Sequence, residues 1–290
     1  MDQAEPREKI DLVKRLAGQR NAIVTGGASG IGRALAEELA RTGVHVVIAD
    51  RQVELAEAVV AGIESRGGTA TAAELDVRDP DRFRRVVEDA VAAAGRLDYL
   101  FNNAGIVVAG EMRDYEPADW EDVFDVNLRG VCHGILAVYP LMIAQGHGHI
   151  INTASLAGLI GPLTLQGSYV ATKHAVVGIS RSLRVEAMRY GVRVSVLCPG
   201  AVRTPILRGG HYGRSKPNLD LAALAARVER LGAMEPALLA RRALRAVARN
   251  RAIIVEPWAA RVPWYLDRLS PWLSEKLWHG ALRLARRTAG

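Results

Sequence analysis

The residues with the clearest chemical potential are a serine, a tyrosine and a lysine near the middle of the chain. Tyr169 and Lys173 are four residues apart and follow Ser155 by fourteen residues. Positions i and i+4 of a helix share a face, so the phenol and the ammonium can point into one site. A free tyrosine has a pKa near 10, and a neighbouring cation is expected to lower it. With a serine hydroxyl to hold a substrate oxygen, this pattern predicts proton transfer on an alcohol or a carbonyl.

A glycine-rich segment, TGGASGIG at 25–32, follows the first predicted strand and begins a helix. Such a segment brings backbone N–H groups and a helix N-terminus to the place where a pyrophosphate would lie. A tight strand–helix turn also favours glycine, so the motif alone is weak. Asp50, at the end of the second predicted strand, can accept the ribose hydroxyls and would repel a 2′-phosphate. Arg51 can instead accommodate that phosphate, so NAD is the favoured cofactor and NADP the alternative.

Strand and helix signals alternate through most of the sequence. The predicted strands cover residues 21–25, 44–50, 69–75, 97–102, 149–153, 192–197 and 252–255. Helices are predicted at 31–42, 53–66, 79–94, 117–145 and 236–250, with a further helix bearing Tyr169 and Lys173. Seven short strands separated by helices predict an α/β, doubly wound Rossmann fold, with a seven-stranded parallel sheet and helices on both faces.

The order and spacing of several motifs over residues 20–257 resemble the short-chain dehydrogenase/reductase family. Beyond the glycine loop, these are Asp76-Val77, Asn102-Asn103-Ala104-Gly105, Asn127 in DVNLRG, Ser155, Tyr169 with Lys173, and Pro199-Gly200. The resemblance implies a dehydrogenase with the catalytic tetrad Asn127, Ser155, Tyr169 and Lys173. It also implies NAD contacts from Gly26, Ser29, Gly30, Ile31, Gly32, Asp50, Arg51, Asp76, Val77, Asn103, Ala104, Gly105, Tyr169, Lys173, Pro199, Gly200, Val202 and Thr204. Family members are commonly dimers or tetramers, so a homodimer or homotetramer is expected.

Each member of the tetrad has an expected role. Tyr169 is the general acid or base at the substrate oxygen, and Lys173 lowers its pKa and holds the nicotinamide ribose. Ser155 donates a hydrogen bond to the carbonyl oxygen, which gains negative charge during hydride transfer. Asn127 is expected to anchor a water that relays the proton through Lys173. A local bond from Asn127 to its own helix backbone is the alternative.

The substrate side of the site is predicted to be apolar. The candidate residues are Val107, Val108, Ala109, Leu156, Leu159, Ile160, Leu163, Leu165, Ile206 and Leu207. Residues 203–233 contain Gly209-Gly210, Gly213 and Pro217 and are predicted to form a mobile substrate lid. Such a pocket suits a lipophilic secondary alcohol or ketone better than a sugar.

Composition limits the class of protein. The chain has 290 residues, 49% of them hydrophobic, and only two cysteines. Neither the cysteines nor the histidines have metal-ligand spacing, so no disulfide framework and no metal site are expected. We expect no signal peptide and no run of the roughly 18 to 20 apolar residues that spans a bilayer, hence a cytoplasmic protein. The expected organisation is an N-terminal extension (1–20), one catalytic domain (21–257) and a C-terminal tail (258–290).

Positive charge and tryptophan are concentrated near the C-terminus. Residues 241–290 carry eleven Lys or Arg and three Asp or Glu, whereas the whole chain has a net charge of +7. Four of the five tryptophans lie in the same stretch. The mixture fits peripheral contact with an anionic membrane, while packing on the protein itself or a partner subunit is an equal alternative. No nucleic-acid-binding fold is predicted. A non-catalytic, membrane-associated nucleotide-binding protein is the competing function, although binding alone does not require the tetrad.

Overall fold

The computed structural model describes residues 20–161, 165–207, 210–217 and 232–287, together with residues 219, 226, 229 and 230. Residues 1–19 of the expected N-terminal extension, and most of 218–231 within the expected lid, lie outside the described residues. The predicted boundaries of these two segments therefore stay predictions.

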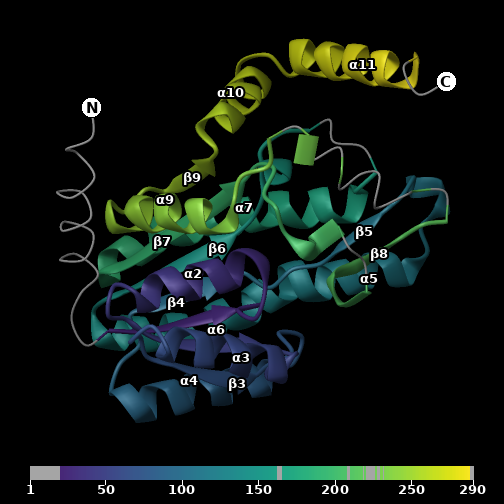
Figure 1. Cartoon of the computed structure of the whole chain (residues 1–290). Helices are drawn as coiled ribbons and strands as arrows, with labels where there is room; N and C mark the ends of the chain where they lie inside the picture. Colours follow the sequence, from purple (N-terminus) through teal and green to yellow (C-terminus); the bar gives the residue numbers. More distant parts are fainter. Residues whose placement is uncertain are drawn as a thin grey trace, which may run out of the picture.

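A seven-stranded parallel sheet forms the centre of the molecule (Figure 1). Its order is β3-β2-β1-β4-β6-β7-β9, and the order reverses between β1 and β4. Ligands of doubly wound folds bind beyond the carboxyl ends of the strands at such a reversal. The strands are β1 (Asn21–Thr25), β2 (His45–Asp50), β3 (Ala70–Glu74), β4 (Tyr99–Asn102), β6 (Gly148–Thr153), β7 (Val192–Pro199) and β9 (Ile253–Glu256).

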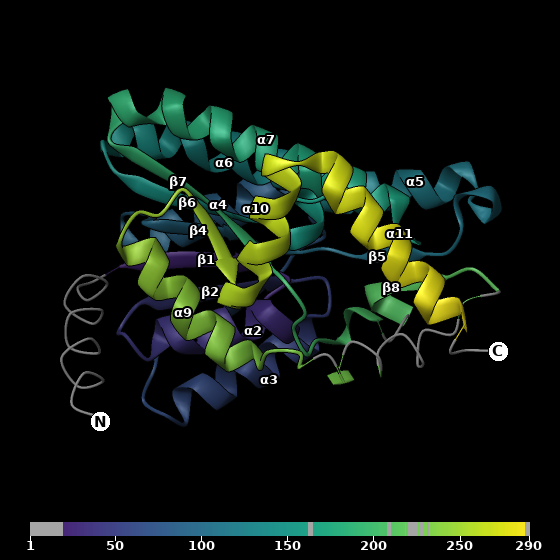
Figure 2. The ribbon, with the colours of Figure 1, turned by 90° about the horizontal axis from the view of Figure 1, so that it is seen from above.

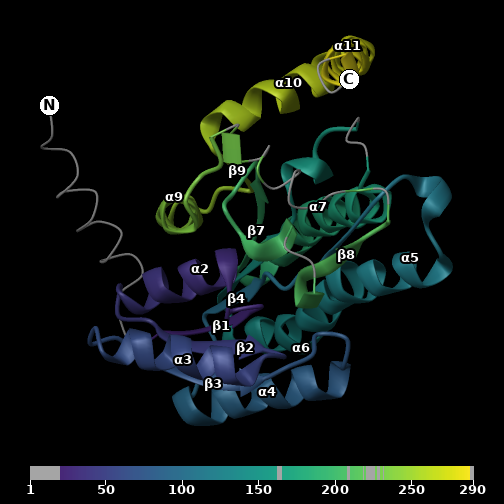
Figure 3. The ribbon, with the colours of Figure 1, turned by 45° about the vertical axis from the view of Figure 1, so that its right-hand side comes forward.

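Helices cover both faces of this sheet, as predicted (Figure 3). One face packs against α2 (Gly30–Ala40), α3 (Val53–Glu64) and α9 (Pro236–Ala248). The other packs against α4 (Pro80–Ala94), α6 (Gly130–Gln145) and α7 (Gly167–Ala187). Each helix buries apolar residues at helical spacing, and burial of such stripes provides most of the folding free energy. The predicted fold class is confirmed.

The long helix predicted at 117–145 contains a change of pitch. α5 (Pro117–Phe124) and α6 are joined by a π-helical turn, η2 (Asp125–Arg129). Such turns often occur at functional sites, and this one contains Asn127. The stretch Pro117–Gln145 is also long and apolar enough to cross a membrane, which corrects the expectation that no such run exists. Core helices pass the same test, and Val131, Val138 and Met142 are buried against the sheet.

A second, two-stranded parallel sheet was not predicted. It pairs β5 (Val107–Ala109) with β8 (Gly213–Ser215). Gly213 has φ +136°, and a Cβ there would lie 1.8 Å from the carbonyl oxygen of Val107, so the pairing requires glycine. Lys216 and Arg214 then form ion pairs with the buried carboxylate of Asp119 at 2.5 and 2.8 Å. These contacts fix residues 213–216 beside the pocket described below.

The C-terminal tail forms a helical arm. After η7 (Trp258–Ala260), the arm consists of α10 (Arg261–Leu269) and α11 (Pro271–Arg287) and stands off the sheet (Figures 1 and 3). Trp264 packs against the core, whereas the side chains of Trp258 and Trp272 are 66% and 64% exposed. Among the described side chains, Trp264 at the base of the arm thus packs on the protein's own domain, as one of the two alternatives for the tail expects.

Candidate active site

A pocket of about 400 Å³ lies beyond the carboxyl ends of β1, β2, β4, β6 and β7. Every predicted cofactor-binding residue lines it except Gly32, and so do Ser155, Tyr169 and Lys173 of the tetrad. Asn127 does not line it, because this residue is fully buried behind the pocket wall. Residues scattered from Gly26 to Thr204 along the chain thus share one cavity.

The glycine loop between β1 and α2 is shaped to receive an anion. Gly26 and Gly30 have φ of +62° and +52°, a region that favours glycine. A Cβ on Gly32 would lie 2.1 Å from the carbonyl oxygen of Gly26, so Gly32 permits packing of α2 on the loop, and its cofactor contact stays a prediction. Ser29 caps α2 without a side-chain hydrogen bond, which leaves the first-turn N–H groups facing the pocket. This donor set fits a pyrophosphate.

The adenosine end of the pocket is acidic. The buried carboxylate of Asp50 accepts hydrogen bonds from the backbone N–H of Ala28 and Gln52, both at 3.0 Å. The guanidinium of Arg78 holds the pKa of Asp76 below its usual value. Arg51 lines the pocket but donates a hydrogen bond to the carbonyl oxygen of His211. Arg51, beside Asp50, is therefore hydrogen-bonded to the segment of His211 and Tyr212, which also lines the pocket.

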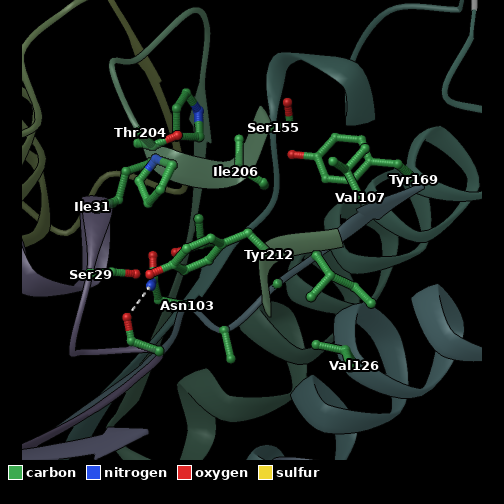
Figure 4. Close-up of a pocket in the computed structure, with 18 of the residues that line it drawn as sticks. Ser29, Ile31, Asn103, Val107, Val126, Ser155, Tyr169, Thr204, Ile206 and Tyr212 are labelled. Atoms are coloured by element: carbon green, nitrogen blue, oxygen red, sulfur yellow. Dashed lines mark hydrogen bonds between the residues drawn. The ribbon is translucent and has the colours of Figure 1, made fainter. Parts of the chain in front are cut away.

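The segment after β4 is fixed on the glycine loop. The backbone N–H groups of Asn103 and Ala104 both donate to the hydroxyl of Thr25, at 3.0 and 3.1 Å. The Asn103 side-chain amide donates to the carbonyl oxygen of Thr25 at 3.2 Å and to that of Gly26 at 3.4 Å, and Figure 4 draws one bond from Asn103 as a dashed line. These bonds hold the NNAG segment against the loop, so both walls of the cofactor region keep one relative position.

Ser155 and Tyr169 meet at the opposite end of the pocket. Ser155 follows β6 and caps the short helix η3 (Leu156–Gly158), while Tyr169 lies in the first turn of α7. The hydroxyl of Tyr169 points toward the side chain of Ser155 (Figure 4). A Cβ on Gly158 would lie 2.4 Å from the carbonyl oxygen of Lys173, so this glycine allows η3 to approach α7 closely. The predicted pairing of the two hydroxyls follows from that approach.

Burial shifts the pKa values of both Tyr169 and Lys173. It raises the pKa of Tyr169, and the neighbouring Ser155 hydroxyl opposes this rise, while the expected lowering of that pKa by Lys173 stays a prediction. Lys173 is 3% exposed, and burial lowers its pKa to about 8. Its Nζ donates to the carbonyl oxygen of Thr153 at 2.9 Å and lies 5.4 Å from the centre of the Tyr169 ring. Loss of water penalises the charged form of each group, so the two pKa values move in opposite directions.

Asn127 connects three parts of the site. Its side-chain amide donates to the carbonyl oxygen of Ile106 at 2.9 Å and accepts from the Ile106 N–H at 2.8 Å. It also lies 3.4 Å from the hydroxyl of Thr172, which donates to the carbonyl oxygen of Tyr169 at 2.8 Å. Within the described part of the chain, the Asn127 side chain bonds to Ile106 and Thr172 and not to its own helix backbone, the alternative considered above. Asn127 instead positions the segment after β4 relative to the helix that carries Tyr169.

The pocket wall beside Tyr169 is apolar, but fewer of the predicted residues form it than expected. Val107, Leu156 and Ile206 line the pocket, as expected. Val108, Ala109 and Ile160 are buried in the core, Leu159 packs against it, and Leu165 does not line the pocket, because the chain turns these side chains elsewhere. Leu163 and the side chain of Leu207 lie outside the described residues. Sequence reasoning missed Val126, Gln166, His211 and Tyr212, which carry no motif and reach the pocket only through the fold.

No group of three His, Cys, Asp or Glu side chains is placed to bind a metal ion within the described part of the chain. The buried hydroxyl of Thr153 has no hydrogen-bond partner among these residues, although Thr153 lines the pocket. Buried polar groups without a partner are uncommon in folded proteins. Such a hydroxyl fits a cavity whose hydrogen bonds are completed by a bound ligand.

Comparisons with known proteins agree with this geometry. The sequence pattern of the short chain dehydrogenase family matches residues 20–211. A cyclohexanol dehydrogenase of Acinetobacter sp. (strain SE19) is 40% identical over 189 residues, 64% of this chain and 74% of that protein. A 2,5-dichloro-2,5-cyclohexadiene-1,4-diol dehydrogenase of Sphingobium indicum is 40% identical over 195 residues, 67% of this chain and 77% of that protein.

Among solved structures, a short-chain dehydrogenase/reductase from Burkholderia phymatum in complex with NAD has a similar fold. Its TM-score is 0.80 at 30% identity, over 88% of this chain and 95% of that chain. The family pattern covers more than half of the sequence, and its motifs lie in one pocket of the matching fold. The protein is an oxidoreductase of the short-chain dehydrogenase/reductase family.

Proposed function

We propose that this protein interconverts a lipophilic secondary alcohol and its ketone with NAD as the hydride acceptor. The observation that carries the proposal is the placement of Ser155 and Tyr169 facing each other, with Lys173 beside them, at the apolar end of the pocket. The glycine loop and Asp50 lie at the other end. One cavity therefore combines a proton donor and acceptor with a site suited to a dinucleotide.

Residues of this chain fit NAD along the whole pocket. The N–H groups at the start of α2 suit the pyrophosphate, and Asp50 suits the adenosine ribose. Lys173 lies where it can hold the nicotinamide ribose, and Pro199, Gly200, Val202 and Thr204 line the nicotinamide end. When bound, NAD accepts a hydride from the carbinol carbon, and NADH returns it to the carbonyl carbon.

Tyr169 supports both directions of proton transfer. In reduction its phenol donates a proton to the substrate oxygen, while the Ser155 hydroxyl stabilises the developing negative charge. In oxidation the phenolate accepts the proton from the alcohol. Because burial raises the pKa of Tyr169 above its usual value of 10.0, the phenol form dominates at neutral pH. We therefore expect oxidation to accelerate as pH rises and reduction to be fastest where the phenol is protonated.

The expected water relay extends this chemistry. Lys173 Nζ donates to the Thr153 carbonyl oxygen, and Asn127 borders Gly105 on the same side as Lys173. A water bound between Lys173 and Ile106 would carry the proton from Tyr169 towards solvent. The Asn127–Ile106 bonds support this path because they fix the carbonyl group that such a water requires.

A cyclic secondary alcohol is the favoured substrate class. Val107, Val126, Leu156 and Ile206 give the substrate end an apolar wall. The two curated relatives named above act on cyclohexanol and on a chlorinated cyclohexadiene diol. An apolar pocket with a few convergent hydroxyl groups suits such rings.

NADP is the alternative cofactor, and Arg51 is the observation that favours it. A guanidinium beside the ribose can bind a 2′-phosphate. However, Arg51 already donates to the carbonyl oxygen of His211, and the neighbouring Asp50 carboxylate would repel a phosphate. We therefore favour NAD.

A homo-oligomer is supported by an exposed apolar face on α6 and α7. Leu136, Val185 and Met188 are 71%, 68% and 66% exposed. The Tyr139 hydroxyl contacts the Glu186 carboxylate at 3.3 Å, which shows that these parts of the two helices are adjacent. Replacement of Leu136 and Val185 by Asp should dissociate the oligomer in light scattering. Leu55→Asp, at an exposed leucine of α3, is the matched control; an unchanged mass in the double variant would reject this interface.

The experiment that tests the function is a steady-state assay of cyclic and acyclic secondary alcohols, with NAD and NADP side by side. NADH formation with cyclohexanol or a larger cyclic alcohol, at kcat/KM at least tenfold above that with NADP, would support the proposal. A preference for NADP would support the alternative cofactor. Cofactor binding without turnover over the whole alcohol and ketone panel would instead favour a non-catalytic nucleotide-binding protein.

A further inference from the structure

The chain that follows β7 passes over the dinucleotide end of the pocket. A Cβ on Gly30, in the glycine loop, would lie 3.4 Å from the Cβ of Thr204, so the chain at Thr204 lies directly on that loop. Further along, the short helix η6 (Gly210–Tyr212) precedes β8, and its last two residues line the pocket. We call residues 210–216 the covering segment.

The covering segment is anchored at its C-terminal end. Its strand β8 lies beside β5, near α5 (Figure 2). The Lys216 backbone N–H donates to the carbonyl oxygen of Ala109 at 2.8 Å, one residue beyond the paired strands. The side chains of Arg214 and Lys216 pair with the buried carboxylate of Asp119 in α5. Strand pairing and ion pairs thus attach this end to the part of the protein next to the substrate wall.

The other end of the covering segment is held by Arg51. This residue follows β2 directly, and its guanidinium donates a hydrogen bond to the carbonyl oxygen of His211, 160 residues further along the chain. Both residues line the pocket and both are exposed, which places the bond at the pocket rim. The bond joins the adenosine side of the pocket to η6, so the covering segment is attached to two separate parts of the protein.

Tyr212 lies between these two attachments. Its ring points into the pocket, toward Ser29 and Asn103 (Figure 4). Ser29 caps α2 beside the N–H groups suited to a pyrophosphate, and Asn103 belongs to the opposite wall of the cofactor region. The covering segment therefore extends a side chain across the part of the pocket that suits the middle of a dinucleotide.

We infer that Arg51 is a positioning residue that retains NAD: its bond to His211 holds the covering segment, and with it Tyr212, across the bound dinucleotide. The inference rests on the proposed dinucleotide function of the pocket. It gives Arg51 a role other than that of a 2′-phosphate ligand, because a 2′-phosphate would compete with the His211 carbonyl oxygen for the same guanidinium. Loss of the bond should therefore speed the release of NADH, which carries no 2′-phosphate.

The first test measures NADH dissociation from the full-length protein by stopped-flow displacement with excess NAD. Arg51→Gln should raise the dissociation rate about threefold to tenfold, as expected for one exposed hydrogen bond from a charged donor. Arg51→Lys keeps a charged donor for the carbonyl oxygen and should return the rate to within about twofold of the parent. Arg66→Gln, at an exposed arginine paired with Glu37 outside the pocket, is the matched control and should change the rate less than about twofold.

A second test uses the protein without any dinucleotide. In hydrogen–deuterium exchange, Arg51→Gln should accelerate exchange of peptides covering residues 210–216 by about threefold or more, because the lost bond allows this end of the segment to open. Peptides of α5 should exchange as in the parent, since the Asp119 anchor remains. This measurement probes the contact separately from cofactor binding and turnover.

A double-variant cycle then asks whether Arg51 and Tyr212 act through the same segment. Tyr212→Ala should also speed NADH dissociation. The double variant Arg51→Gln, Tyr212→Ala should exceed the faster single variant by less than about twofold, because residues that act as one unit are not additive. Multiplied effects of the two single variants would show that they act separately and would overturn the inference.

Two further results would overturn it. Unchanged NADH dissociation in Arg51→Gln, together with weaker NADPH binding, would assign Arg51 to a 2′-phosphate. Faster exchange of residues 210–216 without faster NADH dissociation would show that the covering segment does not retain the cofactor. In both cases the parent still binds NADH. A parent protein that binds neither dinucleotide would instead refute the proposed function and this inference together.

Discussion

The catalytic pocket and the C-terminal arm use similar residue types in opposite ways. At the catalytic pocket, Lys173 in its wall and Asn127 behind that wall are buried, and each is held by groups from other parts of the chain. In the arm, leucine, tryptophan and lysine side chains are exposed, and α11 contacts chiefly its neighbour α10. Apolar residues at helical spacing therefore indicate core packing only where a second surface is present to cover them. The predictions below test this difference, beginning with the largest expected effect.

Tyr169→Phe should lower turnover by about 10² to 10⁴, because it removes the group that gives or takes the proton. Affinity for NAD should change only a few-fold, since the phenol ring remains in place. Steady-state rates and cofactor titration check both statements. Tyr190→Phe, at a tyrosine outside the pocket, is the matched control. Retained turnover in the Tyr169 variant would remove the proposed acid–base role.

Asp50→Ala should weaken NAD binding by at least tenfold, because hydrogen bonds to a charged acceptor contribute about 1.5–3 kcal/mol. With Arg51 still present, the preference over NADP should decrease or reverse. Fluorescence titration with both dinucleotides measures this, and Asp81→Ala, at an exposed carboxylate of α4, is the control. An unchanged ratio of the two affinities would show that Asp50 does not discriminate.

Gly158→Ala should destabilise the protein by about 1–3 kcal/mol, as expected for an overpacked contact. The added methyl group would lie 2.4 Å from the carbonyl oxygen of Lys173, so η3 must move away from α7 and carry Ser155 with it. Turnover should therefore fall together with the melting temperature. At Gly161 a Cβ would meet no atom of the described residues within 4 Å, so Gly161→Ala should have little effect. Equal behaviour of the two variants would contradict the close approach of η3 and α7.

Acid should destabilise the sheet through His149. Burial and the nearby Arg193 and Arg184 lower the pKa of His149 to about 3, from 6.5. As pH falls, the unfolded chain therefore binds a proton at this histidine before the folded protein does. The contribution of neutral His149 to stability is complete above pH 6.5 and is lost progressively towards pH 3. Through this group, the free energy of unfolding should decrease by about 2 kcal/mol between pH 7 and pH 5. Denaturant unfolding at both pH values should show a smaller loss in His149→Phe. Equal losses would mean that His149 does not control acid stability.

The smallest effect is expected on the exposed side of the arm. Leu269→Ser should change the free energy of unfolding by less than about 0.5 kcal/mol, as for other exposed positions. Trp264→Ala, on the opposite side of the same helix, should cost more than 1 kcal/mol because Trp264 packs on the core. Denaturant unfolding of both variants compares the two sides directly. A larger loss for Leu269→Ser would mean that the exposed face packs on the protein in solution.

Sequence reasoning predicted the sheet and most of the site because local patterns determine both. Strands such as residues 21–25 have an apolar centre (22–24) and are buried, and the glycine loop follows this strand directly. The carboxyl ends of parallel strands meet at one edge, which brings Asp50, Asn103 and Ser155 together. These relations depend only on the order of the elements along the chain.

The features that were missed depend on contacts between distant residues. β5 and β8 are only three residues long and pair Val107 with Gly213, so neither gives a periodic signal. The π turn at Asn127 lies between two α-helices, and the spacing of apolar residues in the sequence does not reveal the change of pitch. The opposite pKa shifts of Tyr169 and Lys173 arise from burial, which spacing alone does not give.

The central claim is hydride transfer from a secondary alcohol to NAD with Tyr169 as the base. Cyclohexanol carrying deuterium on the carbinol carbon, or the best substrate of the alcohol panel labelled likewise, tests it most directly. Mass spectrometry of the reduced cofactor should find one deuterium in the nicotinamide ring for each ketone formed, and Tyr169→Phe should abolish this transfer. Ketone formation without deuterium in the nicotinamide ring, or equal transfer by the Tyr169→Phe variant, would contradict the account.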